Sequence, residues 1–378
     1  VTPVGINAME PALFGTIDGR IIMSWTEPDG TGFAVKTATL QGGNWSRPVT
    51  ITTSNSLFVN WADFPTVAAF NDGTLAVSWL QKNTNIPYAY DINVALSSDA
   101  GQTWGSPIVP HDDRSNRQHG FLTLLPTERD KMIAVWLDAR EYNSQSPGDS
   151  FRDAVQLRST TIGKDGTLGK DIPLDLRACS CCQTSAAITE DGTVLIAYRD
   201  RTAGEIRDIS IVRRHNGVWS GPVNVHADGW EISGCPVNGP AIDAQATDAV
   251  VAWFTGADNI ATIKVAFSED SGVTFGPAFK VDSGESVGRV GTLMLATGDA
   301  LISWVEWTSD GEVLMLCRAT KNDGCVARQT ITEHAASGSF NFPKLARSGD
   351  TIYLVWTQPI SSEAGFSTIR MVVMDLSD

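Results

Sequence analysis

The sequence has no long apolar run, and no stretch approaches the roughly 20 residues that a membrane-spanning helix needs. We therefore expect no membrane insertion. It is also short of basic residues, with 28 Lys and Arg against 43 Asp and Glu and a formal net charge of −15. This balance argues against nucleic acid and anionic membrane surfaces as partners. Helical patterning is absent too, since no segment with helical spacing of apolar residues is bounded by helix caps.

A repeat is present instead. Seven apolar, β-branched-rich runs each follow a Gly or Asp turn and end in an aromatic residue, and they read GRIIMSW, GTLAVSW, DKMIAVW, GTVLIAY, DAVVAWF, DALISWV and DTIYLVW. The aromatic residues are Trp25, Trp79, Trp136, Tyr198, Trp253, Trp304 and Trp356, spaced 51 to 62 residues apart. Self-similarity at such a period indicates stacked supersecondary units.

Each repeat contains a succession of short strands. In residues 64–112, FPTVAAF, TLAVSWL, DINVALSSD and PIVPHD are expected strands, joined by turns such as NDG. Four-stranded units repeated around an axis form a β-propeller. The last repeat lacks a fourth strand, and TPVGIN at residues 2–7 is similar to fourth strands elsewhere in the chain. The sequence therefore predicts one domain over residues 1–378, a seven-bladed propeller whose last blade is closed by the N-terminal strand.

Two turns between third and fourth strands share a more specific motif. Ser97-Ser98-Asp99-Ala100-Gly101-Gln102-Thr103-Trp104 and Ser268-Glu269-Asp270-Ser271-Gly272-Val273-Thr274-Phe275 both fit S-x-D-x-G-x-T-[WF]. The Asp carboxylate can accept backbone N–H bonds within the turn, and the Gly can take a positive φ. We expect these motifs to stabilise the turns.

This motif resembles the Asp box of the sialidase (neuraminidase) superfamily and its BNR-repeat relatives. The resemblance implies a propeller fold, and Asp-box propellers include glycan hydrolases, lectin-like modules and assembly factors. Sialidases have six blades and an arginine triad with one arginine in an R-I-P motif. Here the chain has seven repeats, and the segments that lead into the first strands contain no R-I-P. The chain is therefore not a typical sialidase.

The six cysteines are concentrated in two places. Cys179, Cys181 and Cys182 lie in ACSCCQTS, which leads into the fourth repeat, and Cys235 lies in the corresponding segment of the next repeat. In such propellers these segments lie on the open face near the axis, where ligands bind, so we expect the four cysteines to form one cluster. The other two, Cys317 and Cys325, flank a hairpin turn and are interpreted as a cross-strand disulfide or as two separate thiols.

Three interpretations of the four-cysteine cluster remain open. Cys235 can form a disulfide with one of the other three, with or without a vicinal Cys181–Cys182 bond. Alternatively, Cys179, Cys181, Cys182 and Cys235 are thiolate ligands of a soft metal, with copper favoured over zinc because the C-x-C-C spacing is too short for a zinc-finger pair. The third possibility is a reactive thiol whose pKa is lowered by nearby cations.

Polar and aromatic residues are expected around this cluster. They are either solvated loop charges paired with one another, or a ring that grips an anionic or sugar ligand. The candidate ligand-binding residues are Arg140, Arg199, Arg201, Arg207, Arg289, His119, Trp61 and Trp230. The candidate catalytic carboxylates are Asp63, Asp138, Asp200 and Glu205.

Three functions are consistent with these residues. The first is a sialidase-like propeller with a copper site on its open face. The second is a glycan-active hydrolase that uses paired carboxylates. The third is a non-catalytic propeller that binds a carbohydrate, small molecule or protein, with the cysteines as disulfides. An even number of cysteines, and a start at VTPVGIN that would fit removal of a leader, lead us to expect a secreted or periplasmic protein.

Overall fold

A computed structural model describes residues 1–128, 130–143, 154–335, 340–360 and 366–375. The chain divides into two compact units. Unit 1 contains Val1–Trp136, Ser159–Ile172 and Ser337–Asp378, and unit 2 contains Leu137–Arg158 and Pro173–Ala336. Within the described ranges, no helix is long and apolar enough to cross a membrane. The helical structure found there is one short 3₁₀ turn, η1 (Ala257–Asn259).

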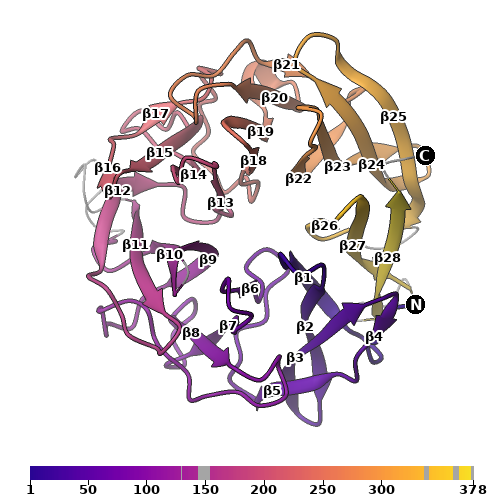
Figure 1. Cartoon of the computed structure of the whole chain (residues 1–378). Coiled ribbons are helices and arrows are strands. Elements are labelled where there is room, and N and C mark those ends of the chain that lie inside the picture. The colour runs from indigo at the N-terminus through magenta and orange to yellow at the C-terminus, as the bar shows by residue number, and fades with distance from the viewer. Residues whose placement is uncertain (129, 144–153, 336–339, 361–365, 376–378) are drawn as a thin grey trace. The chain divides into compact units, whose positions relative to one another are not determined.

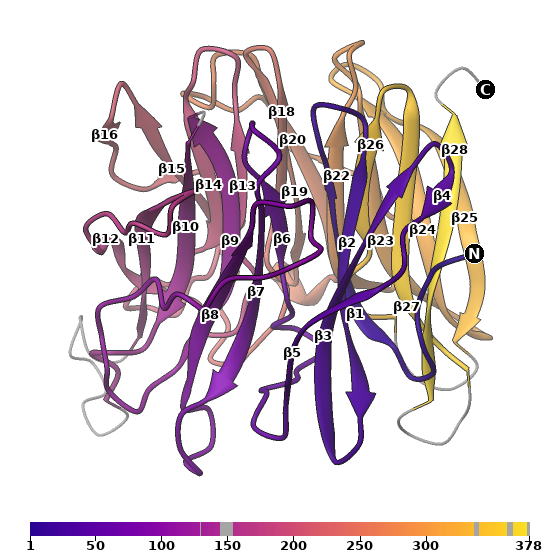
Figure 2. The same ribbon diagram turned by 60° about the horizontal axis from the view of Figure 1, so that its bottom comes forward.

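The strands form seven antiparallel sheets, which are the blades (Figure 1). Three of them belong to unit 1. The first blade contains β1 (Met9–Gly15), β2 (Ile21–Asp29), β3 (Gly32–Gln41), β4 (Asn44–Trp45) and β5 (Val49–Ser54). The second contains β6 (Val67–Ala69), β7 (Leu75–Lys82) and β8 (Tyr90–Ser97), and the seventh contains β26 (Lys344–Ser348), β27 (Thr351–Pro359) and β28 (Ser367–Asp375). Figure 2 shows β7 and β8 side by side along their lengths, as their continuous pairing from Leu75–Ser97 to Lys82–Tyr90 requires.

Three further blades belong to unit 2. The fourth contains β13 (Ser185–Ile188), β14 (Val194–Arg199), β15 (Ile209–His215), β16 (Val218–Trp219) and β17 (Val223–Asn224). The fifth contains β18 (Ala241–Gln245), β19 (Asp248–Thr255), β20 (Thr262–Ser268) and β21 (Phe279–Lys280). The sixth contains β22 (Ser286–Met294), β23 (Ala300–Thr308), β24 (Gly311–Thr320) and β25 (Gly324–Ala335).

The third blade contains three of the four positions where the chain passes from one unit to the other, after Trp136, Arg158 and Ile172. Its strands are β9 (His119–Glu128), β10 (Lys131–Asp138), β11 (Val155–Gly163) and β12 (Ile172–Ala178). The predicted all-β, seven-bladed propeller with mostly four-stranded blades is confirmed.

The repeated aromatic residue has the same place in every blade. It lies on the second strand and is buried, and in most blades its polar atom bonds to a nearby oxygen. Trp25 Nε1 donates to Glu27 at 2.9 Å, Trp304 Nε1 to Glu306 at 2.8 Å, and Trp356 Nε1 to Gln358 at 3.0 Å. A large ring is thereby buried while its donor stays satisfied, which explains why Trp, or Tyr in the fourth blade, recurs at this position.

The two complete Asp boxes have the predicted structure. Asp99 Oδ1 accepts from the Thr103 N–H at 2.9 Å, and the Thr103 hydroxyl donates to Oδ2 at 2.6 Å. Gly101 has a φ of 87°. The second box repeats these contacts at Asp270 and Thr274. Both boxes are turn-stabilising elements.

Two predicted outer strands do not form. In the second blade the segment after Trp104 makes only an isolated bridge, between Val94 and Ile108. The reason is that Pro107 and Pro110 flank this bridge and have no N–H to continue a ladder.

The predicted N-terminal closure of the seventh blade is also not shown, because residues 1–8 contain no strand. The Gly5 N–H donates to Glu27 Oε2 at 3.0 Å. Contact with β28 is made by hydroxyl groups instead: Thr2 Oγ1 donates to the Ile369 carbonyl at 2.8 Å, and Ser367 Oγ to the Ala8 carbonyl at 3.0 Å.

Candidate functional site

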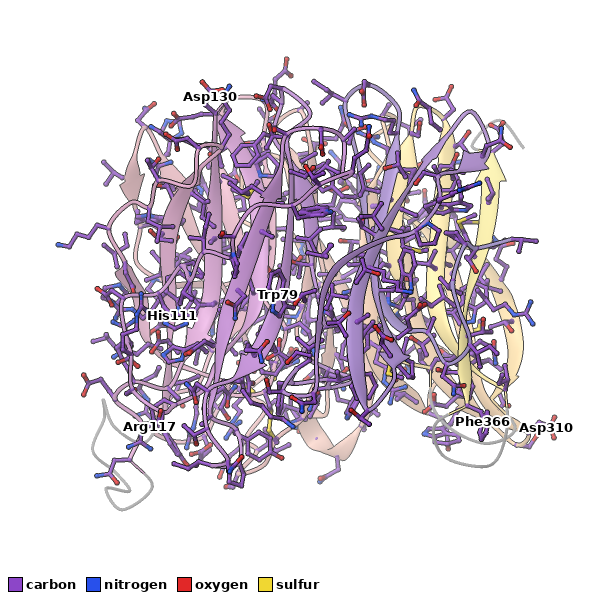
Figure 3. All side chains as sticks on the ribbon, turned by 90° about the horizontal axis from the view of Figure 1, so that it is seen from below. Trp79, His111, Arg117, Asp130, Asp310 and Phe366 are labelled. Atoms are coloured by element: carbon purple, nitrogen blue, oxygen red, sulfur yellow. A yellow bond between two sulfur atoms is a disulfide. The ribbon has the colours of Figure 1, made fainter. Side chains whose placement is uncertain are left out.

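In unit 1, polar groups gather where the first strands of the blades begin. Figure 3 shows Arg117, just before β9, at the end of the unit opposite to Asp130 in the β9–β10 turn. Near the start of β9, the Phe121 N–H donates to Asp63 Oδ1 at 2.8 Å, and the Tyr90 hydroxyl donates to Asp63 Oδ2 at 3.0 Å. The Asp63 carboxylate is therefore held by two neighbouring elements.

Asp63 is in an unusual environment for a carboxylate. Its side chain is only 3% exposed. Burial raises its pKa to about 7, although the hydrogen bonds from Phe121 and Tyr90 act in the opposite direction. Gly120 makes this packing possible, since a Cβ at that position would collide with the Asp63 carboxylate and the Tyr90 ring. A carboxyl group that titrates near neutral pH is suited to proton transfer.

A second buried carboxyl group, Glu10, lies near Asp63. Glu10 is 4% exposed, and its N–H donates to Thr357 Oγ1 at 2.9 Å. Burial, and then the negative charge of Asp63, raise the pKa of Glu10 well above its usual range. Its Oε2 is buried and has no hydrogen-bond partner among the described residues, and its φ of 57° is rare for a residue with a side chain. Backbone strain and an unsatisfied buried oxygen together are typical of a functional position.

Sequence reasoning missed Glu10. The signal for it is its place in MEPAL, which begins β1 and corresponds in the repeat to DFPTV, the segment that contains Asp63.

An aromatic surface continues from Asp63. Trp61 is 41% exposed, and its ring stacks on Phe342 at 6.0 Å with an interplanar angle of 18°. Phe342 also contacts Phe64, at 5.7 Å between ring centroids. Lys344 Nζ lies 4.0 Å from the centroid of the Phe64 ring, and burial lowers the pKa of this lysine to about 7. We call Trp61, Phe64, Phe342 and Lys344 the aromatic platform.

His119, a candidate ligand-binding residue, is fully buried in the same unit. Its ring stacks on His111 at 3.8 Å, and its Nε2 lies 2.9 Å from Asp113 Oδ2. Its Nδ1 lies 3.3 Å from Asp91 Oδ1. Both ring nitrogens of His119 thus lie close to carboxylate oxygens of acidic side chains. Asp91, His111 and His119 also form a group that could hold a metal ion.

In unit 2, the four clustered cysteines are brought together as predicted, but two of them are oxidised. Cys181 and Cys235 form a disulfide, and Cys317 and Cys325 form a second one. Cys179 and Cys182 are free thiols and are buried. The structure does not support the predicted copper site with four thiolate ligands, because Cys181 and Cys235 are joined in a disulfide and a disulfide sulfur is not a thiolate. The disulfide interpretation is confirmed for Cys235, and so is the Cys317–Cys325 pair.

Arg199 lies beside the cysteines and is 1% exposed. Its guanidinium donates to three backbone carbonyls, those of Asn238 at 2.9 Å, Arg207 at 2.6 Å and Phe254 at 2.6 Å. It also packs over the Trp230 ring, 4.9 Å from the centroid. Arg199 therefore joins three segments of unit 2, and Trp230 is buried against it.

The loop between β14 and β15 contains a charge network. Glu205 accepts from Arg201 at 2.6 Å and from Arg207 at 2.8 Å. Asp200 accepts from the Ser210 hydroxyl at 3.0 Å. Burial, and then the charge of Asp175, raise its pKa to about 6.

The remaining candidates are paired elsewhere in unit 2. Asp138 makes a two-point ion pair with Arg140, with distances of 2.9 and 2.8 Å. Arg289 has a φ of 58° and donates to Glu312 at 3.1 Å, and its N–H donates to Asn238 at 2.8 Å.

Comparison with known proteins identifies the fold but no family. The sequence matches no protein-family model and no curated protein. The structure is similar to the polysaccharide lyase Uly1, with a TM-score of 0.55 and 9% identity over 97% of this chain and 89% of the lyase. It is also similar to an alpha-L-arabinanase from Penicillium chrysogenum complexed with arabinobiose, with a TM-score of 0.52 and 13% identity over 98% and 94% of the two chains.

A sialidase is among the similar structures. The NanB sialidase from Streptococcus pneumoniae gives a TM-score of 0.50 and 12% identity over 97% of this chain and 68% of the sialidase. At such low identities the similarity shows the propeller fold alone. The resemblance to sialidases is thus confirmed at the level of architecture, and it extends to propellers of other glycan-acting enzymes.

Proposed function

We propose that this protein is an extracytoplasmic β-propeller enzyme that cleaves a glycan, with its reaction centre at Asp63 and Glu10. The observation that carries the proposal is the pair of buried carboxyl groups in unit 1, one of which has a pKa of about 7. Paired carboxyl groups with separated pKa values are the usual acid and base of glycoside cleavage. Similarity to glycan-acting propellers agrees with this substrate class.

The two carboxyl groups have different roles in this proposal. Asp63 accepts two hydrogen bonds, which favour its ionised form. Glu10 Oε2 accepts none from the part of the chain that the structure describes, and the raised pKa of Glu10 keeps its carboxyl group protonated. Glu10 then donates that proton to the leaving glycosidic oxygen. Asp63, ionised above pH about 7, acts either as the base that takes a proton from a water molecule attacking the anomeric carbon, or as the nucleophile that bonds to that carbon and is later released by water. Tyr90 is a positioning residue that orients Asp63.

The aromatic platform supplies binding. The exposed face of Trp61 offers an apolar surface on which a sugar ring can stack. Lys344, whose pKa is lowered to about 7 by burial, can donate hydrogen bonds to hydroxyl or carboxylate groups of the glycan.

A non-catalytic glycan-binding propeller is the second candidate, because the aromatic platform could bind a sugar without the carboxyl pair. Purified protein incubated with arabinan, ulvan and sialylated glycans distinguishes the two. We expect new reducing ends from the wild type, and binding without cleavage from Asp63→Asn and Glu10→Gln. Binding without cleavage by the wild type would support the second candidate. If the protein neither bound nor cleaved any of these glycans, both candidate functions would be overturned.

The proposed location rests on the disulfides. Two disulfides are typical of proteins that fold in an oxidising compartment, such as the periplasm or the extracellular space. We also propose that residues 1–378 act as one propeller domain.

A further inference from the structure

The cysteine cluster of unit 2 contains both a disulfide and a dithiol. Cys179 Sγ lies 3.8 Å from Cys181 Sγ, which belongs to the Cys181–Cys235 disulfide. The Sγ atoms of Cys179, Cys181 and Cys182 all lie within 4.8 Å of one another. Cys179 and Cys182 are also the two ends of a C-x-x-C sequence, a spacing that allows a disulfide between them. A free thiol is therefore placed beside a disulfide sulfur, with a second thiol available to complete an exchange.

The surroundings of Cys179 favour its thiolate form. Arg207 Nη1 donates to Cys179 Sγ at 3.5 Å, and Arg207 is held in place by Glu205 at 2.8 Å. Burial opposes ionisation most strongly. It is outweighed by hydrogen bonds from the Cys182 thiol and the Cys181 N–H and by the charges of Arg199 and Arg207, which lower the pKa of Cys179 to about 6. Burial raises the pKa of Cys182 well above its usual value. A low-pKa attacking thiol next to a high-pKa buried thiol is typical of redox-active C-x-x-C pairs.

We propose that these four cysteines form an internal thiol–disulfide exchange site. In the first step the Cys179 thiolate attacks Cys181 Sγ, forming a Cys179–Cys181 disulfide and releasing the Cys235 thiolate. In the second step Cys182, after giving its proton to Cys235, attacks Cys179 Sγ, forming a Cys179–Cys182 disulfide and releasing the Cys181 thiolate. One disulfide and two thiols are present before and after, so no external oxidant or reductant is needed.

The exchange changes which parts of unit 2 are covalently joined. The Cys181–Cys235 bond ties the segment before β13 to the segment before β18, whereas a Cys179–Cys182 bond is local to one segment. Cys235 is exposed, so its released thiol becomes accessible to solvent and to thiol-reactive molecules. The site lies in unit 2 and is independent of the carboxyl pair in unit 1.

The test is alkylation of the folded protein with N-ethylmaleimide at neutral pH without reductant, followed by mass-spectrometric mapping of labels and disulfides. We expect Cys235 to become labelled with time, in molecules that carry a Cys179–Cys182 or Cys179–Cys181 bond. The Cys317–Cys325 disulfide is the internal control and must stay intact and unlabelled. Absence of label on Cys235 after prolonged incubation, or label on Cys235 in molecules without a new disulfide, would overturn the proposal.

Three variants assign the steps. Cys179→Ser should abolish labelling of Cys235, and equal labelling in this variant would contradict the proposed attack. Cys182→Ser should stop the exchange after the first step, so labelled molecules should carry only the Cys179–Cys181 bond. This second variant keeps the test decisive even if Cys179→Ser does not fold. Arg207→Gln should slow labelling about tenfold or more, because it removes a charge that favours the Cys179 thiolate.

Discussion

The Tyr90 hydroxyl donates a hydrogen bond to Asp63 Oδ2 at 3.0 Å, from the first residue of β8 to the segment before β6. Burial and the Asp63 charge raise the pKa of Tyr90 well above its usual value, so the phenol stays protonated and remains a donor. This hydrogen bond stabilises the ionised form of Asp63 and holds its pKa lower than burial alone would set it. The proposed reaction therefore depends on Tyr90 through the charge state of Asp63.

The first prediction concerns the pH dependence of glycan cleavage. Activity should rise as pH increases through about 7, because Asp63 must be ionised. Tyr90→Phe removes a hydrogen bond to the carboxylate, so the rising limb should move to higher pH. The measurement is a pH–rate profile, with Tyr88→Phe as the matched control because Tyr88 is exposed. A Tyr90→Phe profile that overlays the wild type would show that Tyr90 does not tune Asp63.

The second prediction concerns stability. The pKa of Asp63 is higher in the folded protein than in the unfolded chain, so the folded state binds the proton more tightly. The contribution of Asp63 to the free energy of unfolding therefore falls as pH rises from about 4 to about 7, and levels off above that range. Asp63→Asn lacks this titration, so its loss of stability between pH 5 and pH 8 should be smaller by roughly 2 to 3 kcal/mol. Urea unfolding at both pH values measures this, and equal losses in both proteins would contradict the pKa of Asp63.

A third prediction distinguishes two arginines. Arg199→Ala leaves three carbonyls, two of them in buried hydrogen bonds, without their donor and should destabilise the protein by about 3 kcal/mol or more. Arg201→Ala removes one partly exposed ion pair with Glu205 and should cost about 1 kcal/mol or less. Thermal unfolding of the two variants gives the comparison. Similar melting temperatures for both would mean that the Arg199 contacts contribute little.

The sequence predicted the parts of the fold that depend on local pattern. The repeated runs ending in residues such as Trp25 and Trp304 identified the second strands, and the Asp boxes identified two turns. Contacts between distant segments could not be predicted. The acceptors of Arg199 come from residues 207, 238 and 254, so its structural role became visible only in the folded chain. Glu10 was missed for a similar reason, because its left-handed backbone and its proximity to Asp63 follow from packing and not from a motif.

A fourth prediction separates the turn motif from the functional site. Asp99→Ala removes an acceptor for the Thr103 N–H and hydroxyl and for the Ser97 hydroxyl, so it should lower the free energy of unfolding. Glycan binding should not change, because the hydrogen bonds of Asp99 to Ser97 and Thr103 lie within the turn itself. Chemical denaturation and a binding titration on the same variant check both statements. Weakened glycan binding in a folded Asp99→Ala protein would assign the box a role beyond the turn.

The last prediction tests the aromatic platform. Trp61 is 41% exposed and rests on Phe342, so its outer face is available while its inner face is fixed. Trp61→Ala should weaken binding of a glycan substrate by about tenfold, because the stacking surface for a sugar ring is lost. Trp307 in β23 is 51% exposed and provides a matched control, since Trp307→Ala removes an equally exposed indole from unit 2. Isothermal titration calorimetry with inactive Asp63→Asn as the background protein measures binding without turnover. Equal affinities for the two tryptophan variants would place the glycan away from Trp61, whereas selective loss in Trp61→Ala would support binding beside the carboxyl pair.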